Sequence, residues 1–228
     1  MQRRAPTFAA ALATGAILAV AAPLAAPAAT LDAPACVGID GKATRTLPVS
    51  AGGFVPGSFV SLRYEAGYLG EPRSAGLFRP DSAGAFAAQL VPPTLVSARV
   101  NRRLVTLRAV DPLRPGLEAA KEITVVRTRV RVTPRAATDP SRTARFFAEG
   151  FEPGRILYAH FSRFGANRAR TVRLGRAGAP CGRIVRRMSL VPGRAPARGS
   201  WAVDVDESPR WSQSTRPQTR TAVLVKRR

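Results

Sequence analysis

The sequence predicts an all-β protein built from two tandem β-sandwich domains. The motif Gly-Phe-x-Pro-Gly occurs twice, at residues 53–57 and 150–154, and Arg45 recurs as Arg142 at the same spacing of 97 residues. Short apolar or alternating runs, separated by Pro, Gly and Asp turns, continue through both halves of the chain, and this pattern is typical of antiparallel strands. A repeat at this spacing indicates two related modules of about 100 residues each.

The individual strands follow from the same alternation. In the first module they are expected at residues 44–49, 58–64, 75–78, 85–91, 104–110 and 122–127. In the second they are expected at residues 129–133, 143–147, 155–161, 170–174, 184–190, 201–205 and 221–226. Six or seven short strands in about 100 residues fit an immunoglobulin-like sandwich. We therefore expect one such domain over residues 30–126 and another over residues 127–228.

The repeated motif predicts a tight turn and a buried aromatic ring in each module. In x-Pro-Gly-x, proline presets the negative φ of the second position and glycine accepts the positive φ of the third. Residues 55–58 and 152–155 are therefore expected to form type II turns. Phe54 and Phe151 precede these turns and are expected to point into the cores, where burying such a side chain contributes about 1.5 to 3 kcal/mol.

A looser correspondence concerns Phe86 and Trp201, each of which follows a glycine-containing turn. If they are counterparts, the second module is eighteen residues longer, because the distance from the motif phenylalanine is 32 residues in the first module and 50 in the second. The additional segment would contain Cys181 and the basic run 183–187. Any specific function of the second module is expected in that segment.

Residues 1–28 have the pattern of a secretory signal peptide. Arg3 and Arg4 supply the positive start, an apolar run continues to Leu24, and a small-x-small site ends at Ala28, after which we expect cleavage. The apolar run is rich in alanine, contains proline and is followed by no basic stop-transfer cluster, which argues against a membrane anchor. No later segment is apolar enough to span a bilayer. The mature chain is therefore expected to be secreted, either extracellular or associated with the cell surface.

The chain has two cysteines, Cys36 and Cys181, one in each module. An even number in an exported protein favours a disulfide, which would connect the second domain with the first or with the mature N-terminus. Unpaired or intermolecular thiols are the alternative, because pairing depends on geometry. Lipid modification of Cys36 is a third interpretation. It is disfavoured because the leucine expected three residues before a lipid-modified cysteine is missing.

Net charge distinguishes the two modules. Of the formal charge of +22, residues 29–125 contribute +3 from 11 basic and 8 acidic groups, and residues 126–228 contribute +17 from 23 and 6. Arginine supplies 33 of the 36 basic side chains, and alanine, glycine and proline are also abundant. A bias toward GC-rich codons is therefore one explanation of the charge. The other is a surface that attracts polyanions.

Alternation indicates where such a surface would lie, because residues 127, 129 and 131 fall on one face of a strand. The expected polyanion-binding residues are Arg127, Arg129, Arg131, Arg170, Arg173, Arg183, Arg186 and Arg187. The expected partner is an anionic polymer of the cell envelope, such as a wall polymer, an acidic polysaccharide or a nucleic acid, or alternatively another envelope protein. A solvated basic surface without a ligand is the competing interpretation.

Residues for catalysis or metal binding are sparse. His160 is the only histidine, and no Gly-x-Ser-x-Gly elbow accompanies it, so a structural or surface role is favoured over a Ser-His-Asp site. Asp204, Asp206 and Glu207 form the densest acidic group of the second module, where pairing with arginines explains them. Two distant cysteines and one histidine lack the spacing of a zinc site. We therefore expect a binding or structural protein without catalysis, cofactor or metal.

The motif Gly-Phe-x-Pro-Gly, followed by a strand and an Asp-x-x-Gly-x-Phe turn, resembles bacterial Ig-like repeats of exported proteins. Segments of the second half resemble uncharacterised secreted proteins of high-GC bacteria, namely Tyr158-Ala159-His160-Phe161, Arg170-Thr171-Val172-Arg173-Leu174-Gly175, Pro180-Cys181-Gly182 and Gly199-Ser200-Trp201. The resemblance covers about half of the mature chain. It implies export and an Ig-like fold, and it transfers no catalytic or binding residue. The cysteine pair usual in Ig domains is absent from each module.

Overall fold

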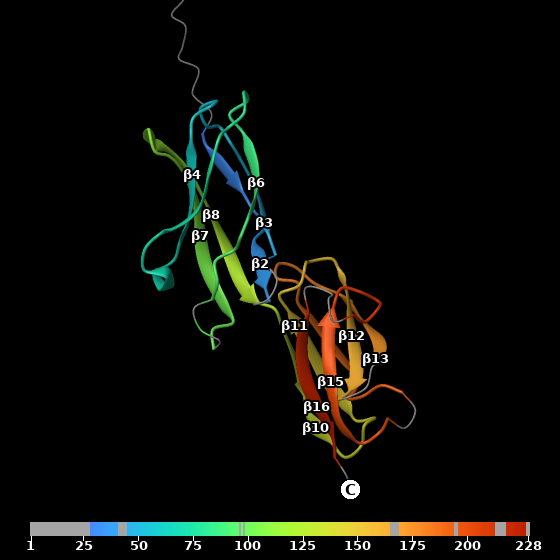
Figure 1. Ribbon diagram of the computed structural model, residues 1–228. Helices are drawn as coiled ribbons and strands as arrows, with labels where there is room; N and C mark the ends of the chain where they lie inside the picture. The colour runs from blue at the N-terminus through green and yellow to red at the C-terminus, as the bar shows by residue number, and fades with distance from the viewer. Residues whose placement is uncertain are drawn as a thin grey trace, which may run out of the picture.

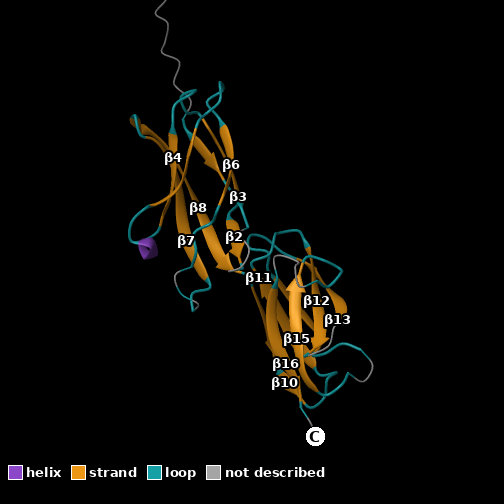
Figure 2. Ribbon diagram, viewed as in Figure 1, coloured by secondary structure: helices purple, strands orange, loops and turns teal. Residues whose placement is uncertain are grey.

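The computed structural model describes residues 28–40, 45–95, 97, 99–164, 169–193, 196–212 and 218–226. Two β-sandwiches lie end to end (Figure 1), and the secondary structure is almost entirely strand and loop (Figure 2). The predicted all-β fold is confirmed, and the paired sheets are consistent with an Ig-like architecture. The expected signal peptide lies outside the described residues, apart from Ala28. In the described part of the chain, no helix has the length and apolar character needed to cross a membrane.

The first sandwich packs a three-stranded sheet against a five-stranded one. The smaller sheet has the order β1-β3-β6 and comprises β1 (Thr30–Asp32), β3 (Leu47–Gly52) and β6 (Phe86–Leu90). The larger sheet has the order β2-β8-β7-β4-β5 and comprises β2 (Cys36–Ile39), β8 (Arg114–Arg127), β7 (Arg102–Asp111), β4 (Val60–Glu65) and β5 (Arg73–Phe78). A short 3-10 helix, η1 (Gly67–Leu69), lies between β4 and β5. Leu62, Leu107 and Ile123 are fully buried between the sheets.

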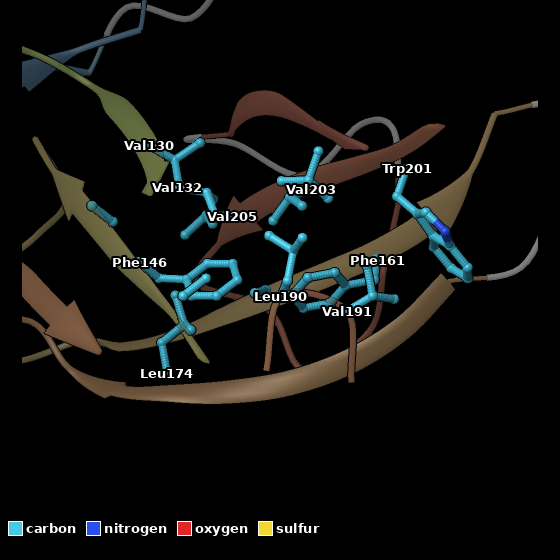
Figure 3. Close-up of a cluster of buried hydrophobic side chains, with 14 of the residues drawn as sticks. Val130, Val132, Phe146, Phe161, Leu174, Leu190, Val191, Trp201, Val203 and Val205 are labelled. Carbon is cyan, nitrogen blue, oxygen red and sulfur yellow. The ribbon is translucent and has the colours of Figure 1, made fainter. Parts of the chain in front are cut away.

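The second sandwich has the same construction. Its smaller sheet has the order β14-β11-β9 and comprises β14 (Ile184–Ser189), β11 (Thr143–Glu149) and β9 (Arg129–Thr133). Its larger sheet has the order β10-β16-β15-β12-β13 and comprises β10 (Ala136–Ala137), β16 (Thr219–Val225), β15 (Gly199–Asp206), β12 (Ile156–Arg163) and β13 (Ala169–Arg176). Figure 3 shows the core, in which the rings of Phe146 and Phe161 meet edge to face at 5.8 Å.

The two sandwiches correspond strand for strand. In each, a first short strand joins the smaller sheet, and the next strand pairs in parallel with the last strand of the larger sheet, as β2 does with β8 and β10 with β16. All thirteen predicted strands overlap observed ones. The strands β1, β2 and β10 were not predicted, because elements of three, four and two residues contain too little alternation to recognise.

The repeated motif forms the same turn in both sandwiches. In residues 55–58 and 152–155, the amide of the fourth residue donates to the carbonyl of the first over 3.1 and 3.3 Å. The third residue is a glycine with a φ of 72° in one turn and 86° in the other. Phe54 and Phe151 are buried. Both the turns and the inward aromatic rings are as predicted.

The expected match between Phe86 and Trp201 is wrong. Phe86 opens β6, whereas Trp201 lies in β15, the counterpart of β7. The true counterparts are Gly84 and Gly182, where an added Cβ would lie 2.2 and 1.8 Å from the carbonyl oxygen of the motif phenylalanine. Aromatic residues follow glycine turns at more than one strand, so the pattern is not specific. No eighteen-residue insertion precedes β14, and the second sandwich is longer instead at residues 207–218, between β15 and β16.

The sandwiches meet at a tight junction. Between β8 and β9 the chain crosses through Thr128, whose amide donates to the Ile39 carbonyl at 2.7 Å and whose hydroxyl donates to the Gly150 carbonyl at 3.0 Å. Gly38 lies so close to the second sandwich that an added Cβ would be 1.8 Å from the Gly150 oxygen. The backbones of the two sandwiches are therefore in direct contact.

Covalent and ionic contacts cross the same junction. Cys36 and Cys181 form a disulfide with a Cα–Cα distance of 5.1 Å, so the intramolecular bridge is the pairing that the fold adopts. Arg45 of the first sandwich forms an ion pair with Glu207 of the second. These contacts hold the two sandwiches in one relative arrangement.

Candidate anion-binding site

Side chains on the outer surface of sheet β14-β11-β9 form the candidate site, and β11 supplies its centre. Alternate residues of β11 from Ala144 to Ala148 are buried in the core. Because successive side chains of a strand point to opposite faces, Arg145, Phe147 and Glu149 lie on the outer side. The middle of this surface is therefore aromatic, with a cation on one side along the strand and a carboxylate on the other.

Strand register places two further arginines beside β11 on the β9 side. Phe147 pairs with Arg131, and Glu149 pairs with Arg129. Neighbouring strands are about 4.8 Å apart, so these side chains are direct lateral neighbours. The alternation predicted for residues 129 and 131 is therefore present.

The β14 side adds two arginines. Arg145 pairs with Arg187 across this edge of the sheet, and Arg183 directly precedes the strand. Val185, which pairs with Phe147, is 42% exposed and extends the apolar centre. Arginines thus lie on both sides of Phe147.

One more arginine comes from the first sandwich, from β7. The resulting surface, which we call the arginine face, contains the six guanidinium groups of Arg102, Arg129, Arg131, Arg145, Arg183 and Arg187. Five of the six, all but Arg187, line an open groove of about 610 Å³. Among the residues that the structure describes, Glu149 is the only carboxylate that lines this groove.

Glu149 is buried and uses both carboxylate oxygens. Oε1 accepts a hydrogen bond from Arg102, and Oε2 accepts two from Arg129, at 3.1 Å from Nε and 2.9 Å from Nη2. A buried charge is tolerated where it is paired and hydrogen-bonded. Two cations share this single anion, so the cluster keeps a positive charge.

Phe147 orients two of the arginines. The guanidinium carbons of Arg129 and Arg183 lie 5.3 and 5.2 Å from the ring centroid. Such contacts stabilise by about 0.5 to 1 kcal/mol each at exposed sites. The ring therefore helps to fix the direction of these two guanidinium groups.

The remaining cations of the face have no anionic partner. Arg131, Arg145 and Arg187 form no salt bridge with any residue that the structure describes. Arg145 and Arg187 also face each other across the strands, and like charges in that position destabilise a sheet. A bound anion would relieve this repulsion.

The corresponding sheet of the first sandwich provides an internal comparison. The exposed side chains of β1, β3 and β6 are Thr30, Asp32, Pro48, Ser50, Ala87 and Gln89, and none is an arginine. Codon bias would act on both sheets alike. It therefore accounts for the abundance of arginine in the chain and leaves the concentration on one sheet unexplained.

The predicted stripe of Arg127, Arg129 and Arg131 is interrupted. Arg127 ends β8, in the first sandwich, and its Nη2 donates to the Ser97 carbonyl at 3.2 Å. The chain leaves one sheet for another at Thr128, between the strands expected at 122–127 and 129–133, so the alternation of residues 127, 129 and 131 does not continue on one face. Only Arg129 and Arg131 of this stripe belong to the arginine face.

The other predicted arginines lie on separate surfaces. Arg183 and Arg187 belong to the arginine face. Arg170 and Arg186 lie where β13 and β14 approach each other, and Arg170 donates to the Pro192 carbonyl at 2.8 Å and Arg186 to the Leu174 carbonyl at 3.4 Å. Arg173 lies on the outer side of β13, because its neighbours Val172 and Leu174 pack against the core. The eight predicted residues therefore do not form one continuous site.

Four residues of this surface were not predicted. Arg145, Phe147 and Glu149 follow the same alternation as Arg131, and a comparison of residues 143–149 with the core pattern would have found them. Arg102 had no such signal, because only the contact between the sandwiches brings it to Glu149.

His160 lies elsewhere, on the outer side of the larger sheet. Its ring is fully buried, with Nδ1 2.8 Å from the Thr171 hydroxyl and Nε2 3.0 Å from Asp206 Oδ1. Both ring nitrogens are engaged and the ring has no solvent-accessible surface. This arrangement is that of a structural histidine.

The neighbouring acidic residues are also paired. Asp204 accepts hydrogen bonds from Arg220 at 2.7 and 2.9 Å, and Trp211, in the segment after β15, lies 3.4 Å from it. The pairing of this carboxylate with an arginine agrees with the sequence-based interpretation. Among the described residues, no group of three or more His, Cys, Asp or Glu side chains could hold a metal ion.

No family model and no curated protein matches the sequence. Similar solved structures include a tetra-tandem repeat from the extending region of a large adhesion protein, with 12% identity over 86% of this chain and 48% of that one, and a TM-score of 0.29. Red sea bream transglutaminase is 15% identical, and the match covers 89% of this chain and 32% of that one with a TM-score of 0.31. Escherichia coli alpha-2-macroglobulin activated by porcine elastase is 11% identical, and the match covers 88% of this chain and 22% of that one with a TM-score of 0.32. The chain spans less than half of each, and scores this low assign it no function.

Proposed function

We propose that this chain is a secreted, non-catalytic protein of two Ig-like domains, residues 30–126 and 127–228, that binds an anionic polymer of the cell envelope on its arginine face. One observation carries the proposal. Among the described residues, six arginines and a single carboxylate gather on this surface, and the exposed residues of the equivalent sheet in the first sandwich include no arginine. The disulfide supports an exported location, because such bonds persist mainly in oxidising compartments.

The chemistry of the face suits repeated anionic groups. A guanidinium group pairs in a fork geometry with phosphate, sulfate or carboxylate. A polymer that neutralises several arginines at once also releases its condensed counterions, which makes binding strong at low salt and weak at high salt. Contacts of this kind recognise charge and its spacing.

A structural role without a ligand is the second candidate. The disulfide, the Arg45–Glu207 ion pair and the contact between Gly38 and Gly150 favour a rigid two-domain unit. Such a unit would act as a spacer in the envelope. The two candidates differ in whether the arginine face itself is needed.

Elution from immobilised heparin, polyphosphate and mixed-sequence duplex DNA separates the candidates and compares three sources of anion. The test variant combines Arg131→Gln, Arg145→Gln and Arg187→Gln. The control combines Arg73→Gln, Arg114→Gln and Arg173→Gln, which removes the same charge from positions outside the face. We expect the test variant to elute at clearly lower salt than the control, which should elute close to the unmodified protein.

The salt dependence gives the size of the effect. For duplex DNA, the slope of log affinity against log salt should decrease by up to about 0.9 for each phosphate that the variant no longer neutralises. Equal shifts for the two triple variants would mean that net charge alone governs binding, and the proposed site would be wrong. Failure of all three polymers to retain the protein would favour the structural role.

A further inference from the structure

Arg102 belongs to the first sandwich yet lies on the arginine face. It opens β7, where it pairs with Val126 at the end of β8. Its guanidinium group reaches Glu149 on β11 of the second sandwich at 2.5 Å. The surface is therefore assembled from both sandwiches.

We propose that Arg102 is a binding residue of the anion site and that buried Glu149 is its positioning residue, so that the site is shared by the two sandwiches. This inference rests on the proposed function. It adds that the isolated second sandwich would have an incomplete site.

The exposure of the two partners supports these roles. The side chain of Glu149 is 4% exposed, whereas that of Arg102 is 56% exposed. Within the described part of the chain, the Arg102 side chain forms one hydrogen bond, from Nη2 to Glu149. Guanidinium has five N–H donors, so the others can bind an anion. Glu149 is thus shielded from a ligand, and Arg102 is accessible to one.

Glu149 holds two guanidinium groups in fixed directions. One oxygen binds Arg102 and the other binds Arg129, whose guanidinium also lies over Phe147. Groups fixed before a ligand arrives lose less conformational freedom on binding. The carboxylate therefore contributes to anion binding through the geometry of the arginines, although its own charge opposes an anion.

The Cys36–Cys181 disulfide keeps both sides of the site in register. Cys36 begins β2 of the first sandwich, and Cys181 lies two residues before Arg183. The amide of Gly150, the residue after Glu149, donates to the Cys181 carbonyl at 2.9 Å. The bond thus connects the first sandwich with the segment that carries Arg183. We expect it to hold Arg102 within reach of Glu149.

The first experiment compares Arg102→Gln with Arg103→Gln in the full mature chain, with duplex DNA as the probe. Arg103 is the adjacent residue on β7, and its guanidinium carbon lies 5.9 Å from the Tyr68 ring. We expect Arg102→Gln to weaken binding by about tenfold, the usual effect of removing one charged hydrogen-bonding group. The salt slope should fall by about 0.9, and Arg103→Gln should change neither value.

The Glu149→Gln variant tests the positioning role by the sign of its effect. Removal of a negative charge alone would tighten the binding of a polyanion. Removal of the group that orients Arg102 and Arg129 would weaken it, and weakening is the result we expect. Tighter binding in a variant with an unchanged near-ultraviolet circular dichroism spectrum would overturn the role of Glu149.

Reduction tests the role of the disulfide. A soluble dithiol supplies two electrons and two protons, the Cys36–Cys181 bond is cleaved to two thiols, and the dithiol is oxidised to its own disulfide. We expect the reduced protein to bind as weakly as Arg102→Gln, and Arg102→Gln to cause no further weakening after reduction. The double variant Cys36→Ser and Cys181→Ser should reproduce this result without a reductant.

The outcomes separate this inference from the proposed function. If Arg102→Gln has no effect while the triple variant of the arginine face still binds more weakly, the shared site is wrong and the proposed function stands. If reduced protein binds as tightly as oxidised protein, the disulfide has no role in the site. If none of these variants changes binding, the proposed function itself fails.

Discussion

Burial couples the ionisation of Tyr64 to the stability of the first core. Its side chain is 3% exposed, and its hydroxyl donates to the Val91 carbonyl at 3.1 Å. Desolvation raises the pKa of this hydroxyl from its ordinary value of 10 to about 12. The folded state thus prefers the neutral hydroxyl. The contribution of Tyr64 to the free energy of unfolding is therefore fully present below pH 10 and is lost as the pH rises toward 12.

Tyr64 should therefore make the protein sensitive to alkaline pH. We expect its ionisation to lower the free energy of unfolding by about 2 to 3 kcal/mol between pH 10 and pH 12. Urea titrations of the unmodified protein and of Tyr64→Phe at pH values across this interval measure the difference. A variant whose stability falls as steeply as that of the unmodified protein would contradict the assignment.

Positive-φ glycines at two turns of the second sandwich show how the repeat constrains its elements. Gly154 lies in the motif turn after β11, Gly182 lies just before β14, and their surroundings differ. Gly154 has a φ of 86° and no atom within 4 Å of an added Cβ. Gly182 has a φ of 57°, and an added Cβ would lie 1.8 Å from the Phe151 carbonyl oxygen. The first position therefore requires glycine for its backbone angle alone, and the second also requires it for space.

Alanine at these two positions should destabilise the protein by different amounts. For Gly154→Ala we expect a destabilisation of about 1 to 2 kcal/mol, the strain of a left-handed residue. For Gly182→Ala we expect about 3 kcal/mol or more, because the backbone of the motif must also move. Urea unfolding at neutral pH measures both. Equal losses of stability in the two variants would show that the close contact at Gly182 does not affect the free energy of unfolding.

The elements also show how far the sequence could predict this protein. Alternation found strands such as the one expected at 143–147, which lies within β11, and the shared face of Arg129 and Arg131, because one face of each strand is buried in a core. It wrongly placed Arg127 on one face with Arg129 and Arg131, although the expected strands end at 127 and begin again at 129, because alternation alone does not show that the chain changes sheet there. Arg102 could not be found at all, since its place depends on how two folded sandwiches dock.

At the scale of the whole molecule, the fixed junction is what combines the sandwiches into one binding surface. The contact of Gly38 with Gly150 leaves no room for a side chain, and the disulfide and the Arg102–Glu149 ion pair lie at the same junction. Opening the junction should therefore affect the arginine face without unfolding either sandwich. We expect the shape of the molecule and its affinity for anions to change together.

Gly38→Ala tests that link. The added Cβ would clash with the Gly150 carbonyl oxygen and open the junction. We therefore expect small-angle scattering to show a wider range of molecular shapes. We also expect the Gly38→Ala protein to bind duplex DNA about as weakly as the Arg102→Gln variant does. Gly67→Ala is the matched control, because an added Cβ there meets nothing within 4 Å. A Gly38→Ala protein with unchanged shape and affinity would disprove a tight junction.

Binding of an anionic polymer to the arginine face can be located residue by residue from amide chemical shifts recorded during titration with short polyphosphate. We expect the largest changes in β9, β11 and β14 and at Arg102. We expect little change in β1, β3 and β6, the equivalent sheet without an exposed arginine. Changes concentrated at the β13 edge, or spread evenly over the basic residues, would show that the arginine face is not the binding site.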